Sequence, residues 1–189
     1  MAQPRERLSR LSRWVDAFNE QLGRAIRWMV LAVVLIGAGN ALARYAGKWF
    51  GMNLTANLWL ELQWYLFSLI FLLGAAYTLH HNSHVRVDVF YARLGPRGRA
   101  WTGLLGTVFF LIPFCLLMII TSWPAVRNSW AILEMSPDPG GLPRYPIKTA
   151  IPIAFFLLLA QGCAELVHHV RTLRGREPAP PLPEPKEGL

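Results

Sequence analysis

Four long apolar stretches dominate the chain. They occupy roughly residues 26–43, 58–80, 101–123 and 147–170. Each stretch is close to the ~20 apolar residues that an α-helix needs to cross the hydrocarbon core of a bilayer. We therefore expect an all-α membrane protein with four transmembrane helices, which form one domain over residues 25–172.

Composition and charge support this interpretation. The chain has 189 residues, of which 53% are hydrophobic, and a soluble domain of this length rarely contains four such stretches. The net charge is +8, but the lysines and arginines lie at the ends of the expected helices. There they would set the topology and meet anionic lipid headgroups. We expect contacts with membrane lipids and no nucleic-acid binding, because no soluble module remains to carry it.

The distribution of basic residues predicts the topology. The N-terminal segment with the opening turn of the first helix, the second loop and the C-terminal tail carry six, four and four basic residues. The first and third loops carry two and three. The positive-inside rule therefore places both termini of this multi-pass protein in the cytoplasm.

Residues 1–24 have the pattern of an amphipathic helix. Six apolar side chains share a face of about 120°: Leu8, Leu11, Trp14, Val15, Phe18 and Leu22. The charged side chains, including Asp16 and Glu20, lie outside this face. We expect the helix to lie in the cytoplasmic interface with Trp14 and Phe18 as anchors; packing against a partner protein is the alternative. Residues 173–189 are proline-rich and are expected to be disordered.

The third loop contains four prolines and two glycines within residues 137–146. This composition disfavours a helix or a paired strand, and the prolines stiffen the segment. The loop is expected to face the periplasm. It is either a simple connector or a docking surface.

Several charged residues on the predicted periplasmic side are candidates for contacts. Glu61 lies in the first turn of the second helix, where the helix dipole stabilises a carboxylate and Asn57 could cap the helix. A structural or partner-contact role is favoured over direct handling of an ion or substrate. Arg127, Glu134 and Arg144 are further candidates for contacts with partner proteins.

The histidines on the predicted cytoplasmic side raise the question of a metal site. His80, His84 and Asp88 have the spacing i, i+4, i+8 and would share one face of a continuous helix. Asn82 and Ser83 favour a turn between them, so we predict no metal site here.

Two pairs of histidines keep a second class of function open. His168 and His169 end the fourth apolar stretch, and with His80 and His81 they could hold a bis-histidine haem. These histidines lie at the interface, and no second set occurs on the opposite side. We therefore predict no cofactor, with a haem-binding electron-transfer protein as an alternative.

The sequence contains no motif for catalysis. It has no glycine-rich phosphate loop, no nucleophile elbow and no zinc signature. The apolar stretches have no group of ionisable residues at their centres. These features indicate a non-catalytic scaffold subunit whose first and fourth segments and N-terminal helix offer apolar surface to a larger protein. A stand-alone regulator or small exporter is a further alternative.

Two short sequence motifs lie at the two ends of the second apolar stretch. Trp59 and Glu61 occur in WLELQWYLF at the start of the second apolar stretch. His84, Arg86 and Asp88 follow that stretch in HNSHVRVDVFYARLGPR. The first is a tryptophan–acid pattern, and the second is a more specific histidine–arginine–aspartate signature.

A third sequence, EMSPDPGGLPRYPIKTAIPIAF, is the loop rich in glycine and proline that leads into the last helix and Gln161. Together the three sequences resemble the small membrane subunit (four-helix, Q-type) of tripartite ATP-independent periplasmic (TRAP) transporters, over roughly residues 20–172. Many family members have two adjacent acids after the tryptophan. Here Glu61 is followed by Leu62 and Gln63.

The resemblance implies a location in the bacterial inner membrane and a function that spacing alone does not show. Such a subunit pairs with a large membrane subunit that holds the sodium and substrate sites and moves by an elevator-type mechanism. A soluble periplasmic substrate-binding protein delivers the substrate, usually an organic anion. The third loop is most similar to a branch associated with 2-oxoacids and other monocarboxylates. In this setting Arg86 and Asp88 are expected to brace the cytoplasmic end of the second helix.

Overall fold

The computed structural model describes residues 4–51, 56–81 and 94–175, and these residues are mostly helical. Four of the helical segments are long and apolar enough to cross a membrane, which confirms the predicted fold class. Within the described ranges the only pairing between extended residues is an isolated bridge from Met135 to Pro143. The helical elements are α1 (Pro4–Phe50), α2 (Asn57–His80), α4 (Pro96–Gly106), the π-helical turn η1 (Thr107–Leu111), α5 (Ile112–Ala131) and α6 (Arg144–Leu173).

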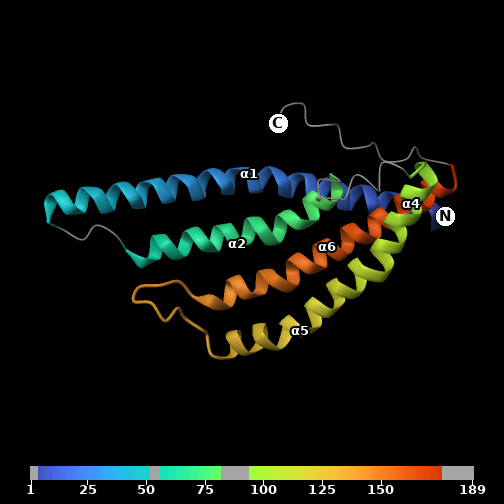
Figure 1. Cartoon of the computed structure of the whole chain (residues 1–189). Coiled ribbons are helices and arrows are strands. Elements are labelled where there is room, and N and C mark those ends of the chain that lie inside the picture. The colour runs from blue at the N-terminus through green and yellow to red at the C-terminus, as the bar shows by residue number, and fades with distance from the viewer. Residues whose placement is uncertain (1–3, 52–55, 82–93, 176–189) are drawn as a thin grey trace, which may run out of the picture.

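The helices lie side by side in the order α1, α2, α6, α5, and α1 also contacts α6 (Figure 1). The interior position of α6 makes it the most deeply covered span. Small residues of α6, including Ala150, Ala154 and Ala164, are buried and let neighbouring backbones approach closely. Part of the surface of the fourth segment therefore packs within the chain, whereas Ile153 and Phe156 stay exposed, and its contact with a partner stays a prediction.

Helix α1 continues without interruption from the amphipathic segment into the first apolar stretch. Its 47 residues correspond to about 70 Å at 1.5 Å per residue, more than twice the ~30 Å of a hydrocarbon core. One part of α1 therefore extends beyond the membrane. Gly23 allows this extension to pack on α2, because a Cβ atom at this position would overlap the ring of Tyr77.

The third span contains a proline next to a π-helical turn. Pro113 has no N–H group to continue the helical hydrogen bonds. One turn earlier the helix widens, and the N–H of Ile112 donates to the carbonyl of Thr107. Such π-helical turns are an established cause of kinks, and the α4–α5 segment is visibly bowed (Figure 1).

The outer helices leave large apolar side chains uncovered. On α1, Trp28 is 73% exposed and Trp49 is 90% exposed. On η1, Phe110 is 77% exposed, and on α5, Ile120 is 69% exposed. These faces need either lipid or another protein to cover them.

The close packing of α4 on α6 depends on a glycine. A Cβ atom at Gly103 would overlap the ring of His169, whereas a Cβ atom at Gly106 has no neighbour within 4 Å. We expect Gly103→Val to destabilise the protein by about 1–3 kcal/mol through overpacking. Gly106→Val, in the same helix, is the matched control. Thermal unfolding of the purified protein in detergent measures both effects, and equal melting temperatures for the two variants would contradict the packing.

Candidate functional site

Polar side chains gather at the two ends of the bundle. At the predicted periplasmic end, the carboxylate of Glu61 is buried, with 3% exposure. It accepts hydrogen bonds from the hydroxyl of Ser136 and the backbone N–H of Leu142, both in the third loop. A buried carboxylate is tolerated when such donors surround it. The loop approaches closely at Gly141, where a Cβ atom would lie 2.7 Å from both oxygens of Glu61.

Two further side chains of α2 hold the same loop. The Asn57 amide donates to the Pro139 carbonyl at 3.2 Å, and the Tyr65 hydroxyl donates to the Pro143 carbonyl at 2.6 Å. Residues 57, 61 and 65 have the spacing i, i+4, i+8, which places them on one face of the helix. The expectation that Asn57 caps α2 is wrong: α2 begins after Ala56 without a side-chain cap, and Asn57 is the first residue of the helix.

The third loop also has internal order. The N–H of Ser136 donates to the Leu142 carbonyl at 3.1 Å, and the N–H of Gly141 donates to the Asp138 carbonyl at 3.0 Å. Gly140 lies in the left-handed region, with a φ of 71°, as the tight turn requires. The loop is therefore a defined surface fixed to α2 rather than an unattached connector.

The charged candidates near this loop differ in their surroundings. Glu134 forms an ion pair with Lys148, and its carbonyl accepts from the N–H of Arg144 at 2.7 Å. The Arg144 guanidinium lies 6.0 Å from the centre of the Trp64 ring. Arg127 is exposed and makes no ion pair with any residue that the structure describes.

The ion pair also affects the acidity of Glu134. Its hydrogen bond from Lys148 is the chief reason that the pKa of Glu134 lies below its usual value of 4.5.

At the predicted cytoplasmic end, Gln161 of α6 links several polar groups. Its side chain is fully buried. Its carbonyl oxygen accepts from the Asn19 amide at 2.6 Å, and its nitrogen donates to Asp16 at 3.0 Å and to Glu165 at 3.3 Å. This one amide therefore joins the polar face of α1 to α6.

Two histidines complete this cluster through one carboxylate. Asp16 Oδ1 lies 3.1 Å from His80 Nδ1, and Asp16 Oδ2 lies 3.4 Å from His168 Nε2. The carboxylate thus bridges the rings of α2 and α6, in the place where the haem alternative needs an iron atom. His169 lies against Gly103 of α4 instead. The described geometry therefore does not favour the haem alternative.

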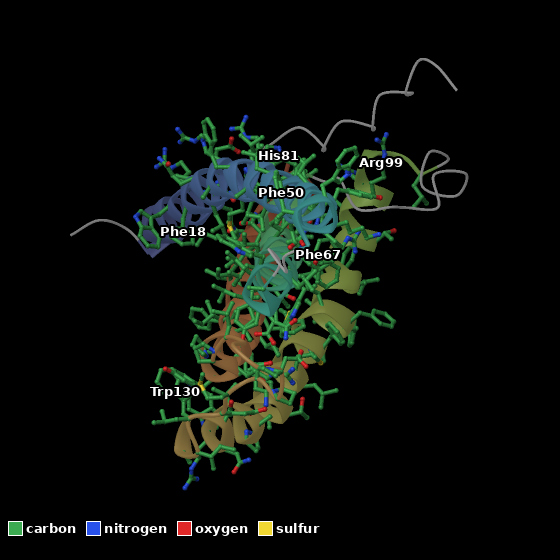
Figure 2. All side chains as sticks on the ribbon, turned by 90° about the vertical axis from the view of Figure 1, so that its left-hand side faces the viewer. Phe18, Phe50, Phe67, His81, Arg99 and Trp130 are labelled. Carbon is green, nitrogen blue, oxygen red and sulfur yellow. The ribbon has the colours of Figure 1, made fainter. Side chains whose placement is uncertain are left out.

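The predicted interfacial anchors lie on the opposite side of α1 from this cluster. Trp14 is 68% exposed and Phe18 is 42% exposed, and their rings stack with centroids 6.0 Å apart. Phe18 is at the outer edge of α1, away from the other helices (Figure 2). This position suits an anchor in the lipid interface, although the interfacial role itself stays a prediction.

Sequence reasoning missed several residues of both clusters. Asp16 and Glu20 were assigned only to a solvated face of α1, although their spacing with Asn19 could have indicated a polar contact face. Ser136 and Lys148 gave no local signal. His84, Arg86 and Asp88 lie outside the described residues, so their predicted roles stay predictions.

A comparison with known families identifies the family of this chain. Residues 33–172, about three quarters of the chain, match the family described as "Tripartite ATP-independent periplasmic transporters, DctQ component". The chain belongs to the DctQ family. It is thus a small membrane component of a TRAP transporter, which is a transport protein and not an enzyme. No individual curated protein and no solved structure matches the chain significantly.

The two polar clusters of this DctQ component differ in how much of each the family match covers. Glu61 and the whole third loop lie inside the matched range, whereas Asp16, Asn19 and Glu20 precede it. The cluster around Gln161 therefore joins helices α2 and α6, which the family match covers, to a segment of α1 that it does not cover.

The central position of Gln161 leads to a prediction. Gln161→Met keeps a similar size but removes the amide, which leaves Asn19 without its partner. We expect a loss of about 1–3 kcal/mol in stability, because a buried polar group becomes unsatisfied. Gln21→Met, at an exposed position of α1, is the matched control. Thermal unfolding measures the difference, and an unchanged melting temperature for Gln161→Met would contradict the network.

The lowered pKa of Glu134 predicts a specific pH dependence. A carboxylate whose pKa is lower in the folded state adds stability above its unfolded pKa and loses that contribution as the pH falls through its folded pKa. The stability difference between the wild type and Glu134→Gln should therefore stay constant from neutral pH down to about 4.5. It should disappear at lower pH. Melting temperatures of both proteins across this range test the prediction, which fails if the difference is lost near neutral pH.

Proposed function

We propose that this DctQ component is a non-catalytic scaffold subunit of a sodium-driven, binding-protein-dependent importer of organic anions. It pairs with the large elevator-type membrane subunit and presents its third loop on the periplasmic side. The family supports the transporter role. The sequence resemblance to a branch associated with 2-oxoacids and other monocarboxylates supports the substrate class.

The observation that carries the scaffold role is an uncovered stripe on α1. Four large apolar residues repeat every seven positions and are 73%, 61%, 69% and 90% exposed: Trp28, Leu35, Leu42 and Trp49. A seven-residue repeat keeps one seam of a helix facing a neighbouring helix. The comparable face of α5 is interrupted by Pro113 and Pro124. The α1 stripe is therefore the better match for a helix of the large subunit, and lipid covers α5.

The distribution of ionisable groups also supports a scaffold. Among the described residues, the acidic side chains lie at the two ends of the helices, in the clusters around Glu61 and around Asp16. In α2 no Asp, Glu, Lys or Arg follows Glu61, and in α6 none lies between Lys148 and Glu165. An ion or substrate pathway through the chain would need such groups at depth. We therefore assign the sodium and substrate sites to the large subunit.

We further propose that the third loop contacts the binding protein or the large subunit. Its fixed position on Glu61 makes it a preformed surface, which lowers the entropy cost of docking. Glu134 and Arg144 lie at its base, and the exposed Arg127 lies close by in the sequence on α5. On the cytoplasmic side, His84, Arg86 and Asp88 stay candidates for structural contacts, on the basis of their sequence alone.

A matched pair of substitutions tests the α1 stripe. Leu42 and Ile120 are both 69% exposed, on α1 and α5. We expect Leu42→Gln to reduce the recovery of the large subunit when the tagged chain is purified gently from its native membrane. Ile120→Gln should leave that recovery unchanged, because Ile120 lies outside the proposed contact.

Two results would contradict this proposal. Equal recovery of the large subunit with both variants would argue against the α1 stripe as the contact. A wild-type chain that purifies alone or as a homo-oligomer, and transports without a large subunit, would favour the stand-alone alternative. With the complex in hand, uptake in proteoliposomes with and without a sodium gradient tests the driving ion.

A further inference from the structure

A group of three potential metal ligands lies where α1 meets the end of α2. The carboxylate of Glu20 and one ring nitrogen each from His80 and His81 lie within 4.8 Å of one another. Glu20 Oε2 and His81 Nε2 are 2.9 Å apart. The side chains of Glu20 and His81 are 43% and 41% exposed, so an ion can reach them from solvent. Figure 2 shows His81 beside α1.

The chemistry of this group suits a divalent transition metal. Imidazole nitrogen and carboxylate oxygen bind Zn²⁺ at about 2.0–2.2 Å. Ligand atoms around a tetrahedral ion at that distance are about 3.3–3.6 Å apart. The Glu20 and His81 atoms are 2.9 Å apart and all three ligand atoms lie within 4.8 Å of one another, so the group is close to the size that such a site needs.

Neighbouring side chains hold the histidines in place. Asp16 Oδ1 lies 3.1 Å from His80 Nδ1 and can accept a hydrogen bond from it. A carboxylate on one ring nitrogen fixes the tautomer and raises the basicity of the other nitrogen, which is a common arrangement at zinc sites. In His80 the carboxylate of Asp16 lies at Nδ1, so Nε2 is the ring nitrogen that remains to bind a metal ion. The ring of Tyr77 packs on His81 with centroids 4.4 Å apart.

We propose that Glu20, His80 and His81 bind a divalent transition metal ion of the Zn²⁺ type, with water as the remaining ligand. The set differs from the sequence-based candidate of His80, His84 and Asp88 in two of its three members. The proposal departs from the prediction of no metal site. The bound ion clamps the part of α1 that precedes the membrane to the end of α2. The site is independent of the proposed contact with the large subunit, because its ligands lie away from the α1 stripe.

Zn²⁺ titration of the full-length protein, purified with a tag that contains no histidine, tests the proposal. We expect one bound Zn²⁺ per chain and a rise in melting temperature on binding. Glu20→Gln and His81→Ala should each weaken Zn²⁺ binding at least about tenfold, the lower limit for loss of even an outer-shell partner. Both side chains are partly exposed, so these variants are expected to fold. His169→Ala, which removes a histidine outside the group, is the control.

Co²⁺ gives a second and independent measurement. Its visible absorption reports on nitrogen and oxygen ligands in a four-coordinate site, and the band should be absent from Glu20→Gln and His81→Ala. Zn²⁺ affinity that is unchanged in both variants would overturn the proposal, as would a wild-type protein that binds no Zn²⁺. Neither outcome bears on the scaffold role, which the purification of the complex tests separately.

Discussion

The hydrocarbon core of a bilayer offers no water to satisfy a polar group, and this constraint shapes the whole molecule. The helices satisfy their own backbone groups, so the side chains decide where polarity can lie. In the described residues, Glu61 collects donors at one end of the bundle and Gln161 joins polar groups toward the other. Packing of small residues connects α6 to its neighbours between these ends. The ends therefore specify how the helices assemble, while the middle of the bundle stays apolar.

The continuity of α1 connects these two regions. A single helix carries the exposed stripe from Trp28 to Trp49 and, before it, the polar face of Asp16 and Glu20. A displacement of the stripe therefore reaches the cluster around Gln161 through one continuous helix. Gly23 keeps the two parts in register with α2, because the Tyr77 ring occupies the space where a side chain would be. The proposed scaffold role requires such stiffness.

The sequence allowed prediction of those features that depend on local composition. The apolar length of residues 58–80 predicted α2 almost to the residue. The partners of Glu61 were not predictable, because Ser136 and Leu142 lie more than seventy residues away in the sequence. The contacts of the polar face of the N-terminal segment were not predicted for a related reason. Amphipathicity shows that Asp16 differs from Phe18, but it does not show whether water or another helix lies against Asp16.

The single acid of α2 now has a physical explanation. Leu62 follows Glu61, so the tryptophan motif at the start of α2 contains one acid. Both oxygens of Glu61 already accept a hydrogen bond from the loop, one from Ser136 and one from Leu142. Residue 62 lies about 100° further around the helix, so an acid there would point away from these donors. A buried carboxylate without donors would cost free energy rather than add to the attachment. One acid at position 61, with Asn57 and Tyr65 on the same face, is therefore sufficient to hold the loop.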